Sequence, residues 1–428
     1  MVKTSFPKEK IKVLLLEGVH PVAVERFKAE GFSVQLHEKA WDAAALEKAI
    51  GDGAGAGAAH ILGIRSKTSL TAPVLAGAKR LMTVGCFCIG TNQVALGEAS
   101  QRGVAVFNSP FSNTRSVAEL TLAEIIALHR RMVDQSTAMH TGNWDKSAAG
   151  AHEVRGRTLG IVGYGHIGTQ VSILAEALGM RVIFFDILSK LSLGNARACR
   201  SLDELLKASD AVTLHVPETA ATRGLIGRAQ IKAMKKGAHL INNARGSVVD
   251  IASLAEALKS GHLAGAALDV FPYEPSGRDE VFKSELLGLP NVILTPHVGG
   301  STEEAQESIA HDVCDKLIRF INVGATSGSV NMPVVDLPEQ GSASDAADGK
   351  PGRRSHRILH LHKNVPGVMS KVNAVMAEQK VNINAQYLQT KGDVGYVVFD
   401  IEPTPTKGPL IVEALRKLPE TIKVRALW

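Results

Sequence analysis

The glycine loop Gly163-x-Gly165-x-x-Gly168 most restricts the folds open to this chain of 428 residues. It follows the apolar segment TLGIV at 158–162 and precedes the helical pattern TQVSILAEAL at 169–178. Glycines in this order let the backbone turn tightly and approach a pyrophosphate, which then lies at the N-terminus of a helix. The pattern predicts a strand, turn and helix of a doubly wound parallel α/β sheet that binds a dinucleotide.

A second apolar segment, RVIFFD, ends in Asp186 at the distance expected for the acid that binds the adenosine ribose hydroxyls. The alternative is that Asp186 is a helix N-cap. A carboxylate here would repel the 2′-phosphate of NADP by roughly 4 kcal/mol at an effective dielectric constant of 20. Lys190 lies close in sequence and could offset part of that repulsion. The residues favour NAD over NADP.

Three residues further along the chain have the side chains needed to oxidise an alcohol beside a carboxylate. Arg245, Glu274 and His297 stand in the runs NNARGS, FPYEP and TPHVGG. A histidine has the near-neutral pKa required of the base that removes the hydroxyl proton. A carboxylate on its other ring nitrogen fixes the tautomer and stabilises the imidazolium. An arginine offers a planar, permanently charged fork to a substrate carboxylate.

Each of these residues also has a simpler explanation. Arg245 alone is more often a surface cation, Glu274 between two prolines a solvated loop carboxylate, and His297 an inert imidazole in a strand-end turn. All three, however, fall at or just past the ends of the apolar segments HLINN, AGAALDVF and NVILTP. Ligands of an open α/β sheet bind outside those carboxyl ends. The combination therefore favours a nicotinamide-dependent 2-hydroxyacid dehydrogenase site.

The chain resembles the bacterial D-3-phosphoglycerate dehydrogenases that carry a C-terminal ACT domain, a branch of the D-2-hydroxyacid dehydrogenase family. The resemblance extends over most of the chain. Its motifs are IRSKT (64–68), GCFCIGTNQV (85–94), FNSPFSNTRSVAE (107–119), GYGHIGTQ (163–170), LHVP (214–217), TPHVGGSTEEAQE (295–307) and NINAQYLQT (382–390).

The resemblance implies roles for individual residues. Arg245 would bind the substrate carboxylate and carbonyl, Glu274 would support the base, and His297 would be the acid-base. Asp186 would hold the ribose and Asp269 would meet the nicotinamide side. The full set of implied cofactor residues is Gly163, Gly165, His166, Ile167, Gly168, Asp186, Asn243, Ala244, Arg245, Asp269, His297, Val298, Gly299 and Gly300.

The resemblance also implies a site for the phosphate end of the substrate. That set is Arg65, Ser66, Lys67, Asn113 and Lys146, with Arg245 at the carboxylate end. Lys67 stands where bacterial relatives carry arginine, which keeps the charge but loses the bidentate fork. The segment Asn242-Asn243-Ala244 before Arg245 also departs from the family pattern without removing a catalytic side chain.

The composition and the placement of turn-forming segments indicate several soluble domains. The chain is 45% hydrophobic and 21% charged, and its net charge of +6 is spread thinly, which suits anionic substrates better than nucleic acid. Neither a signal peptide nor an apolar segment of about 20 residues is apparent, so no membrane partner is expected. The four cysteines lack disulfide or zinc spacing, which indicates a reducing cytoplasm and no metal site.

The segments predict an α/β fold of three domains. Residues 1–112 and 302–335 are expected to form a discontinuous, flavodoxin-like substrate-binding domain around a Rossmann domain at 113–301. Capping boxes at Ser116-x-x-Glu119 and Ser301-x-x-Glu304 would open its two crossing helices. Residues 336–355 read as a linker. From 356 to 428 the order is βαββαβ, a ferredoxin-like module that matches an ACT domain.

The prediction is NAD-dependent oxidation of D-3-phosphoglycerate to 3-phosphohydroxypyruvate, the first step of phosphorylated L-serine biosynthesis. The resemblance implies a homotetramer, reduction of 2-oxoglutarate to 2-hydroxyglutarate as a second activity, and feedback inhibition by L-serine bound at His362, Asn364 and Asn382. Two alternatives stay open: a hydroxypyruvate or glyoxylate reductase, and a NAD-sensing transcriptional corepressor on the same fold.

Overall fold

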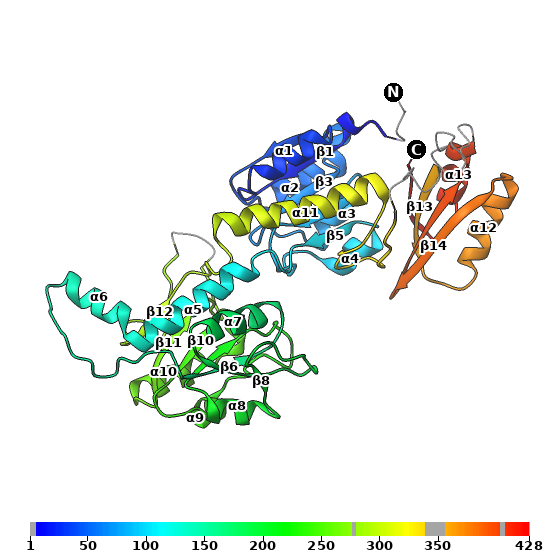
Figure 1. The fold of residues 1–428 in the computed structure, drawn as a ribbon. Coiled ribbons are helices and arrows are strands. Elements are labelled where there is room, and N and C mark those ends of the chain that lie inside the picture. Colours follow the sequence, from blue (N-terminus) through cyan, green and yellow to red (C-terminus); the bar gives the residue numbers. More distant parts are fainter. Residues whose placement is uncertain (1–5, 276–279, 339–355, 403–406, 428) are drawn as a thin grey trace, which may run out of the picture. The chain divides into compact units, whose positions relative to one another are not determined.

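The chain divides into two compact units in a computed structural model that describes residues 6–275, 280–338, 356–402 and 407–427 (Figure 1). The first unit comprises Met1–Pro110 and Glu307–Trp428, and the second comprises Phe111–Gln306. Of the predicted linker, residues 339–355 lie outside the described residues.

The first unit begins with a five-stranded parallel sheet in the order β2-β1-β3-β4-β5, the flavodoxin-like order expected. The elements are η1 (Lys8–Lys10), β1 (Lys12–Leu15), α1 (Val22–Ala29), β2 (Ser33–Leu36), α2 (Ala43–Ile50), η2 (Asp52–Gly57), β3 (Ile61–Ile64), α3 (Ala72–Gly77), β4 (Thr83–Cys86), α4 (Leu96–Gln101) and β5 (Ala105–Asn108). Strands β3, β4 and β5 are buried at every position. That burial explains their uninterrupted apolar sequence, which is typical of a parallel sheet covered on both faces.

Helix α11 (Glu303–Val323) packs against this sheet. Ile309, Val313 and Leu317 recur at helical spacing on one face of α11, and all three are buried. Gly85 in β4 allows the close approach, because a Cβ there would lie 2.7 Å from side-chain carbons of both Val313 and Leu317.

The second unit holds a seven-stranded parallel sheet in the order β12-β11-β10-β9-β6-β7-β8. The elements are α5 (Thr114–Arg130), α6 (Met132–His140), β6 (Thr158–Val162), α7 (His166–Ala177), β7 (Arg181–Phe185), β8 (Arg197–Ala198), α8 (Leu202–Ala208), β9 (Ala211–Leu214), α9 (Arg228–Ala233), β10 (Ala238–Asn242), η3 (Gly246–Val248), α10 (Ile251–Lys259), β11 (Leu263–Leu268) and β12 (Val292–Leu294). The strand order reverses between β6 and β9, the point where such sheets bind ligands.

Both predicted capping boxes are wrong. Ser116 lies inside α5, where its hydroxyl donates to Gly299 O at 2.6 Å, and Glu119 pairs with Arg115 instead of capping. At the start of α11, the hydroxyl of Thr302 accepts from Ala305 N at 3.2 Å, one residue after the predicted cap. In α5 the serine bonds to a distant residue instead of capping the helix. In α11 the neighbouring threonine caps the helix in place of the predicted serine.

Residues 356–427 form the predicted βαββαβ module around an antiparallel sheet of order β14-β15-β13-β16. Its elements are β13 (His356–Lys363), α12 (Val368–Glu378), β14 (Ile383–Lys391), β15 (Val394–Ile401), α13 (Lys407–Arg416) and β16 (Thr421–Leu427). One face of the sheet packs on α12 and α13. The other face joins the core of the first unit, because Leu359, Leu361 and Tyr396 share a cluster with residues of α11.

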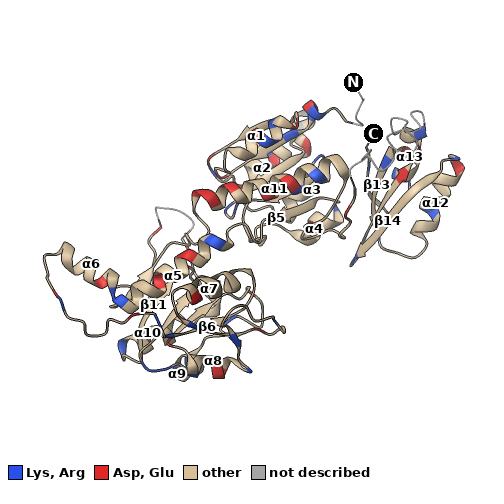
Figure 2. Ribbon diagram, viewed as in Figure 1, with Lys and Arg blue, Asp and Glu red and all other residues tan. Residues whose placement is uncertain are grey.

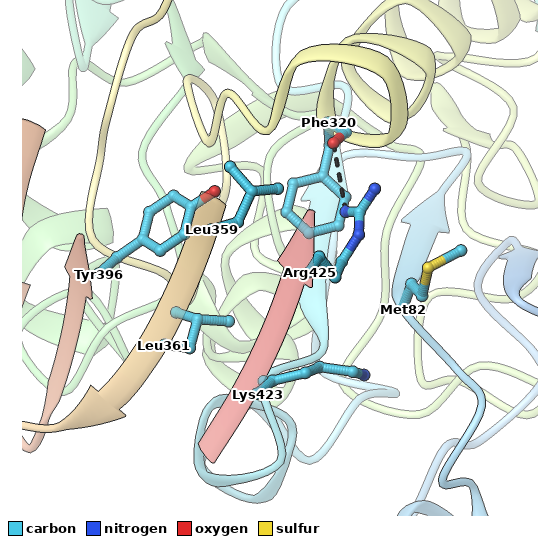
Figure 3. A pocket seen from close by; sticks show the side chains of 8 residues that line it. Met82, Phe320, Leu359, Leu361, Tyr396, Lys423 and Arg425 are labelled. Carbon is cyan, nitrogen blue, oxygen red and sulfur yellow. Dashed lines mark hydrogen bonds between the residues drawn. The ribbon is translucent and has the colours of Figure 1, made fainter. Parts of the chain in front are cut away.

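Two partly buried cations of the module donate to backbone carbonyls of the rest of the first unit. Lys423 donates to Leu81 O at 2.6 Å, and Arg425 donates to Ile321 O at 2.7 Å, at the end of α11. Figure 3 shows these side chains lining a small crevice with Met82, Phe320, Leu359, Leu361 and Tyr396. Burial lowers the pKa of Lys423 to about 8.

The helices carry charges of both signs on their surfaces. Figure 2 shows Lys and Arg interspersed with Asp and Glu along the helices. Among the described residues, no helix is both long enough and apolar enough to span a bilayer. The same residues contain no group of three or more His, Cys, Asp or Glu placed to hold a metal ion.

Candidate active site

The structure brings the predicted catalytic histidine and its carboxylate into contact. His297 follows β12 and Glu274 follows β11, which are neighbours in the sheet. His297 Nδ1 lies 2.8 Å from Glu274 Oε2, and Glu274 Oε1 accepts from Phe271 N at 3.2 Å. The side chain of His297 is 53% exposed. With Nδ1 engaged, Nε2 is the ring nitrogen left to exchange a proton with a substrate.

The two groups alter each other's pKa in opposite directions. The hydrogen bond to Glu274 raises the pKa of His297, burial opposes this, and the charge of Asp269 adds to the increase. Burial alone would raise the pKa of Glu274, but its hydrogen bond to His297 and the charges of His297 and Arg245 bring it below the usual value. The imidazolium is therefore the stabilised form of the pair.

Arg245 follows β10, the next strand of the sheet, in a loop fixed by its own neighbours. The Asn242 side chain accepts from Ala244 N at 3.2 Å and donates to Arg245 O at 3.1 Å. Gly246 lies so close to the chain after β11 that a Cβ would be 1.9 Å from the carbonyl carbon of Phe271. Arg245 is only partly buried and its charge reaches both members of the dyad.

Asp269 holds the loop that carries His297. Its carboxylate is 2% exposed. It accepts from Val298 N and Gly299 N, each at 2.8 Å, and from the Thr295 hydroxyl at 2.6 Å. Side chains at the following glycines would crowd this loop, because a Cβ on Gly300 would lie 2.3 Å from Asn113 Nδ2 and one on Gly299 would lie 3.0 Å from Asp269 Oδ2. Asp269 thus orders the segment 295–299 in addition to any contact with a cofactor.

The glycine loop has the geometry of a pyrophosphate turn. Gly163 has φ 93°, and a Cβ there would lie 2.6 Å from His215 O. A Cβ on Gly168 would lie 2.2 Å from Gly163 O, whereas one on Gly165 would meet nothing within 4 Å. Helix α7 begins at His166 with no side-chain cap, which leaves its first N–H groups available to an anion.

The remaining cofactor residues surround this turn. Asp186 follows β7 and accepts from Tyr164 N at 2.8 Å and Leu188 N at 2.9 Å, and no helix begins there. The N-cap alternative is therefore excluded. The exposed His166 packs on Phe111 with ring centroids 4.0 Å apart, and Ile167 is partly buried. The glycines, the uncapped helix and Asp186 fit a dinucleotide.

The predicted phosphate residues are split between the two units. In the first unit, Arg65, Ser66 and Lys67 follow β3, with the two side chains after Arg65 exposed. The carboxylate of Glu17 accepts from the backbone N–H groups of Arg65 (3.1 Å), Lys67 (2.9 Å) and Thr68 (2.8 Å). Because a protein carboxylate already occupies these amides, a substrate phosphate would depend on the side chains.

The second unit contains the other two phosphate candidates. Asn113 is 8% exposed, at the start of α5, and its Oδ1 is buried without a partner. Lys146 is exposed, with its ammonium 6.0 Å from the ring centroid of Trp144. The structure therefore places Asn113 against the Gly300 loop and Lys146 on the surface.

The three effector candidates lie at two ends of the module. Asn364 is exposed and donates to Gly392 O at 3.0 Å, while His362 is 3% exposed with its Nε2 buried and unpartnered. Asn382 lies beside Glu402, beyond the far end of β15. The eight residues of β15 separate these ends by roughly 25 Å at the usual rise per residue. One site using all three residues would need two modules.

Sequence reasoning missed two residues that shape the site. Glu17 orders the loop of Arg65, and an acid directly after the buried strand KVLLL was a usable signal. Glu124 on α5 bonds to Asn243 beneath the Arg245 loop. Its place on the buried face of an amphipathic helix was the signal, because a buried carboxylate needs a partner.

Comparison with known proteins agrees with this geometry. Residues 122–299 match the family described as D-isomer specific 2-hydroxyacid dehydrogenase, NAD binding domain, and residues 358–423 match the AHAS small subunit-like ACT domain. D-3-phosphoglycerate dehydrogenases of Dictyostelium discoideum (99% of each chain covered) and Escherichia coli strain K12 (100% of each) are both 49% identical. The solved D-lactate dehydrogenase of Aquifex aeolicus, complexed with NAD and lactic acid, is 28% identical with a TM-score of 0.64 over 75% of this chain and 99% of that one.

Fold and site together define a NAD-dependent oxidoreductase with an attached ACT module. Full-length identity of 49% narrows the class further. The chain belongs to the D-3-phosphoglycerate dehydrogenase family.

Proposed function

We propose that this enzyme oxidises D-3-phosphoglycerate to 3-phosphohydroxypyruvate with NAD, the first step of the phosphorylated route to L-serine. The observation that carries the proposal is the His297–Glu274 pair, 2.8 Å apart, beside Arg245 at the carboxyl ends of three adjacent strands. The names of the full-length relatives support the choice of substrate.

The residues divide the work of the reaction. Nε2 of His297 takes the C2 hydroxyl proton, and Glu274 at Nδ1 fixes the tautomer and stabilises the resulting imidazolium. Arg245 binds the substrate carboxylate and the oxygen that becomes the carbonyl. NAD, when bound, would supply the acceptor for the hydride from C2. Gly163, Gly165 and the start of α7 hold the pyrophosphate, and Asp186 meets the adenosine ribose.

Recognition of the phosphate is assigned to Arg65, Ser66, Lys67, Asn113 and Lys146. Arg65 and Lys67 supply two positive charges on a loop that Glu17 holds in place. Lysine at position 67 acts as a point charge and not as a bidentate fork. The phosphate should therefore contribute to affinity through charge more than through geometry.

The direct test is a set of initial rates with 2-hydroxy acids that differ only in a terminal phosphate. D-3-phosphoglycerate should exceed D-glycerate in kcat/KM, and Lys67→Met should reduce that ratio while leaving the D-glycerate rate unchanged. Equal rates for the two acids would favour a hydroxypyruvate or glyoxylate reductase. Absence of NADH formation with every acid would favour the NAD-sensing corepressor.

Regulation forms the second part of the proposal. L-serine would bind between two ACT modules at His362, Asn364 and Asn382, and thereby inhibit a cytoplasmic tetramer. In support, Asn382 lies at the opposite end of the module from the other two residues, so a complete site requires a pair. Arg425 and Lys423 bond the module directly to α11 and to Leu81 in the rest of the first unit. A signal therefore need not pass through residues 339–355. Reduction of 2-oxoglutarate is proposed as a side activity.

A further inference from the structure

A buried acid and amide meet beneath the loop of Arg245. Glu124 on α5 is 3% exposed, and Asn243 after β10 is 7% exposed. Asn243 Nδ2 donates to Glu124 Oε2 at 2.7 Å and to Thr121 Oγ1 at 3.0 Å. The other two oxygens, Glu124 Oε1 and Asn243 Oδ1, are both buried without a hydrogen-bond partner. Two side chains that are already bonded to each other thus carry two acceptors that lack a donor.

One proton can satisfy both acceptors. A carboxylic acid protonated on Oε1 can donate to the amide oxygen while the amide N–H donates to Oε2. Without that proton, two buried acceptors have no donor and one of them belongs to a charged group, and both conditions are unfavourable. We propose that Glu124 is a positioning residue that holds the 242–245 loop as a neutral acid paired with Asn243, and that loss of its proton weakens cofactor binding.

The surroundings of Glu124 favour the neutral form. Burial raises its pKa to about 7, the Asn243 hydrogen bond opposes the rise, and the charge of Asp269 adds to it. Burial lowers the pKa of His129 on α5, and it lowers that of His239 on β10 to about 3, so neither supplies a compensating positive charge. The buried residues of α7, which packs on α5, are uncharged.

The pair acts on the cofactor through the main chain. Asn243 precedes Ala244 and Arg245, and Asn242 fixes the same loop from the other side. Below the pKa of Glu124 three hydrogen bonds would anchor the loop to α5: the two donated by Asn243 Nδ2 and the one donated by the protonated acid. Above that pKa only the two bonds from Nδ2 remain, together with two buried acceptors that lack a donor, so the loop relaxes. This inference rests on the NAD-binding part of the proposed function and not on the identity of the substrate.

The test is NADH affinity of the full-length enzyme, measured by fluorescence titration from below to above neutral pH with no substrate present. The wild-type Kd should rise about three- to tenfold as Glu124 ionises, equivalent to a pKa difference of up to about one unit between free and bound enzyme. Glu124→Gln should keep the low-pH Kd at every pH, because two amides can form the same pair. Glu124→Ala should bind NADH weakly throughout.

The matched control is Glu119→Gln, which removes an exposed carboxylate from the same helix and should keep the wild-type profile. His297 remains in every variant, so its own titration cannot explain a loss of the step. A step that persists in Glu124→Gln, or a wild type without one, overturns the proposal. Infrared difference spectra of the wild type across the same range give a second readout, since a protonated carboxyl must disappear near neutral pH.

Discussion

His297 combines a reactive side chain with an unusual backbone. Its φ is 56°, in the left-handed region that residues other than glycine rarely adopt. The residue is held there by its N–H to Thr295 O at 3.0 Å and by the bond from Nδ1 to Glu274. Backbone strain of this kind persists only when the surroundings over-determine it, and it collects at functional sites. The backbone and the side chain of His297 are therefore both held in defined positions.

Replacement of His297 by alanine tests the base. His297→Ala should leave NADH affinity nearly intact and lower turnover by about a hundred- to ten-thousandfold, the usual contribution of general acid-base catalysis. Steady-state rates and a binding titration measure the two quantities. His311→Ala, which removes a partly exposed histidine on α11 away from the dyad, serves as the control. Wild-type turnover in His297→Ala would remove the assignment.

The pH profile tests Glu274. Because Glu274 raises the pKa of His297, the base form, and with it kcat/KM for oxidation, should appear only as the pH rises through that elevated value. Glu274→Gln removes the negative charge, so the His297 pKa should fall and the rising limb should move to lower pH. Turnover on the plateau should also fall, since the imidazolium is less stabilised. An unmoved limb would show that Glu274 does not act on His297.

Asp186 is the residue that decides between cofactors. Asp186→Ala should weaken NAD binding and relieve repulsion of the NADP phosphate, so the ratio of the two kcat/KM values should narrow. The carboxylate also orders Tyr164 and Leu188, so thermal unfolding should be measured alongside. A wild type that already prefers NADPH would contradict this reading of Asp186.

At the scale of the elements, the loops that follow the strands are positioned by close contacts between backbone segments as well as by side-chain hydrogen bonds. The Arg245 loop touches the chain after β11 at Gly246, while α5 contacts it at Asn243 and contacts the Gly299 loop through Ser116. Helix α5 therefore supports both the arginine loop and the histidine loop. Such support lets side chains from three strands keep one geometry.

Gly246→Ala tests the backbone contact. A Cβ 1.9 Å from the carbonyl carbon of Phe271 must displace the loop, because that contact is backbone and cannot rotate away. Overpacking of this kind costs about 1–3 kcal/mol or more, and Arg245 should move with it, raising KM for the hydroxy acid. The control is Gly97→Ala, where a Cβ meets nothing within 4 Å. Unchanged KM and unfolding temperature in Gly246→Ala would refute the contact.

At the scale of the whole molecule, regulation is the property that depends on more than one module. Inhibition requires serine to bind the less active arrangement more tightly, and a coupling of about 1–3 kcal/mol is typical. For the proposed inhibition, the Arg425 and Lys423 bonds to the end of α11 and to Leu81 would connect the module to the rest of the first unit. Binding and inhibition are therefore separate measurements.

The expected result is that L-serine binds the full-length enzyme and lowers its initial rate, and that Asn364→Ala weakens both effects by about tenfold. Calorimetry gives the binding and initial rates give the inhibition. Asn373→Ala, an exposed asparagine on α12 of the same module, is the matched control. Absence of binding heat in the wild type, or inhibition unaltered in Asn364→Ala, would refute the site.

The sequence by itself determined the elements and their classes. Apolar runs predicted the strands of both parallel sheets except the short, exposed β8, and the GYGHIG turn and the order βαββαβ followed from local chemistry. Motif position also located Arg245, Glu274 and His297 near strand ends, because sheet topology brings such ends to one edge. Hydrophobic periodicity and turn-forming residues are local properties, so a single sequence is enough to identify them.

The tertiary structure decided which polar group meets which. Ser116 bonds to Gly299 instead of capping α5, Glu17 takes the amides beside Arg65, and Glu124 pairs with Asn243, 119 residues away in the chain. None of these partners lies within a few residues, so no local pattern identifies them. The buried surroundings then raise the pKa of Glu124, and burial is a property of the packed molecule alone.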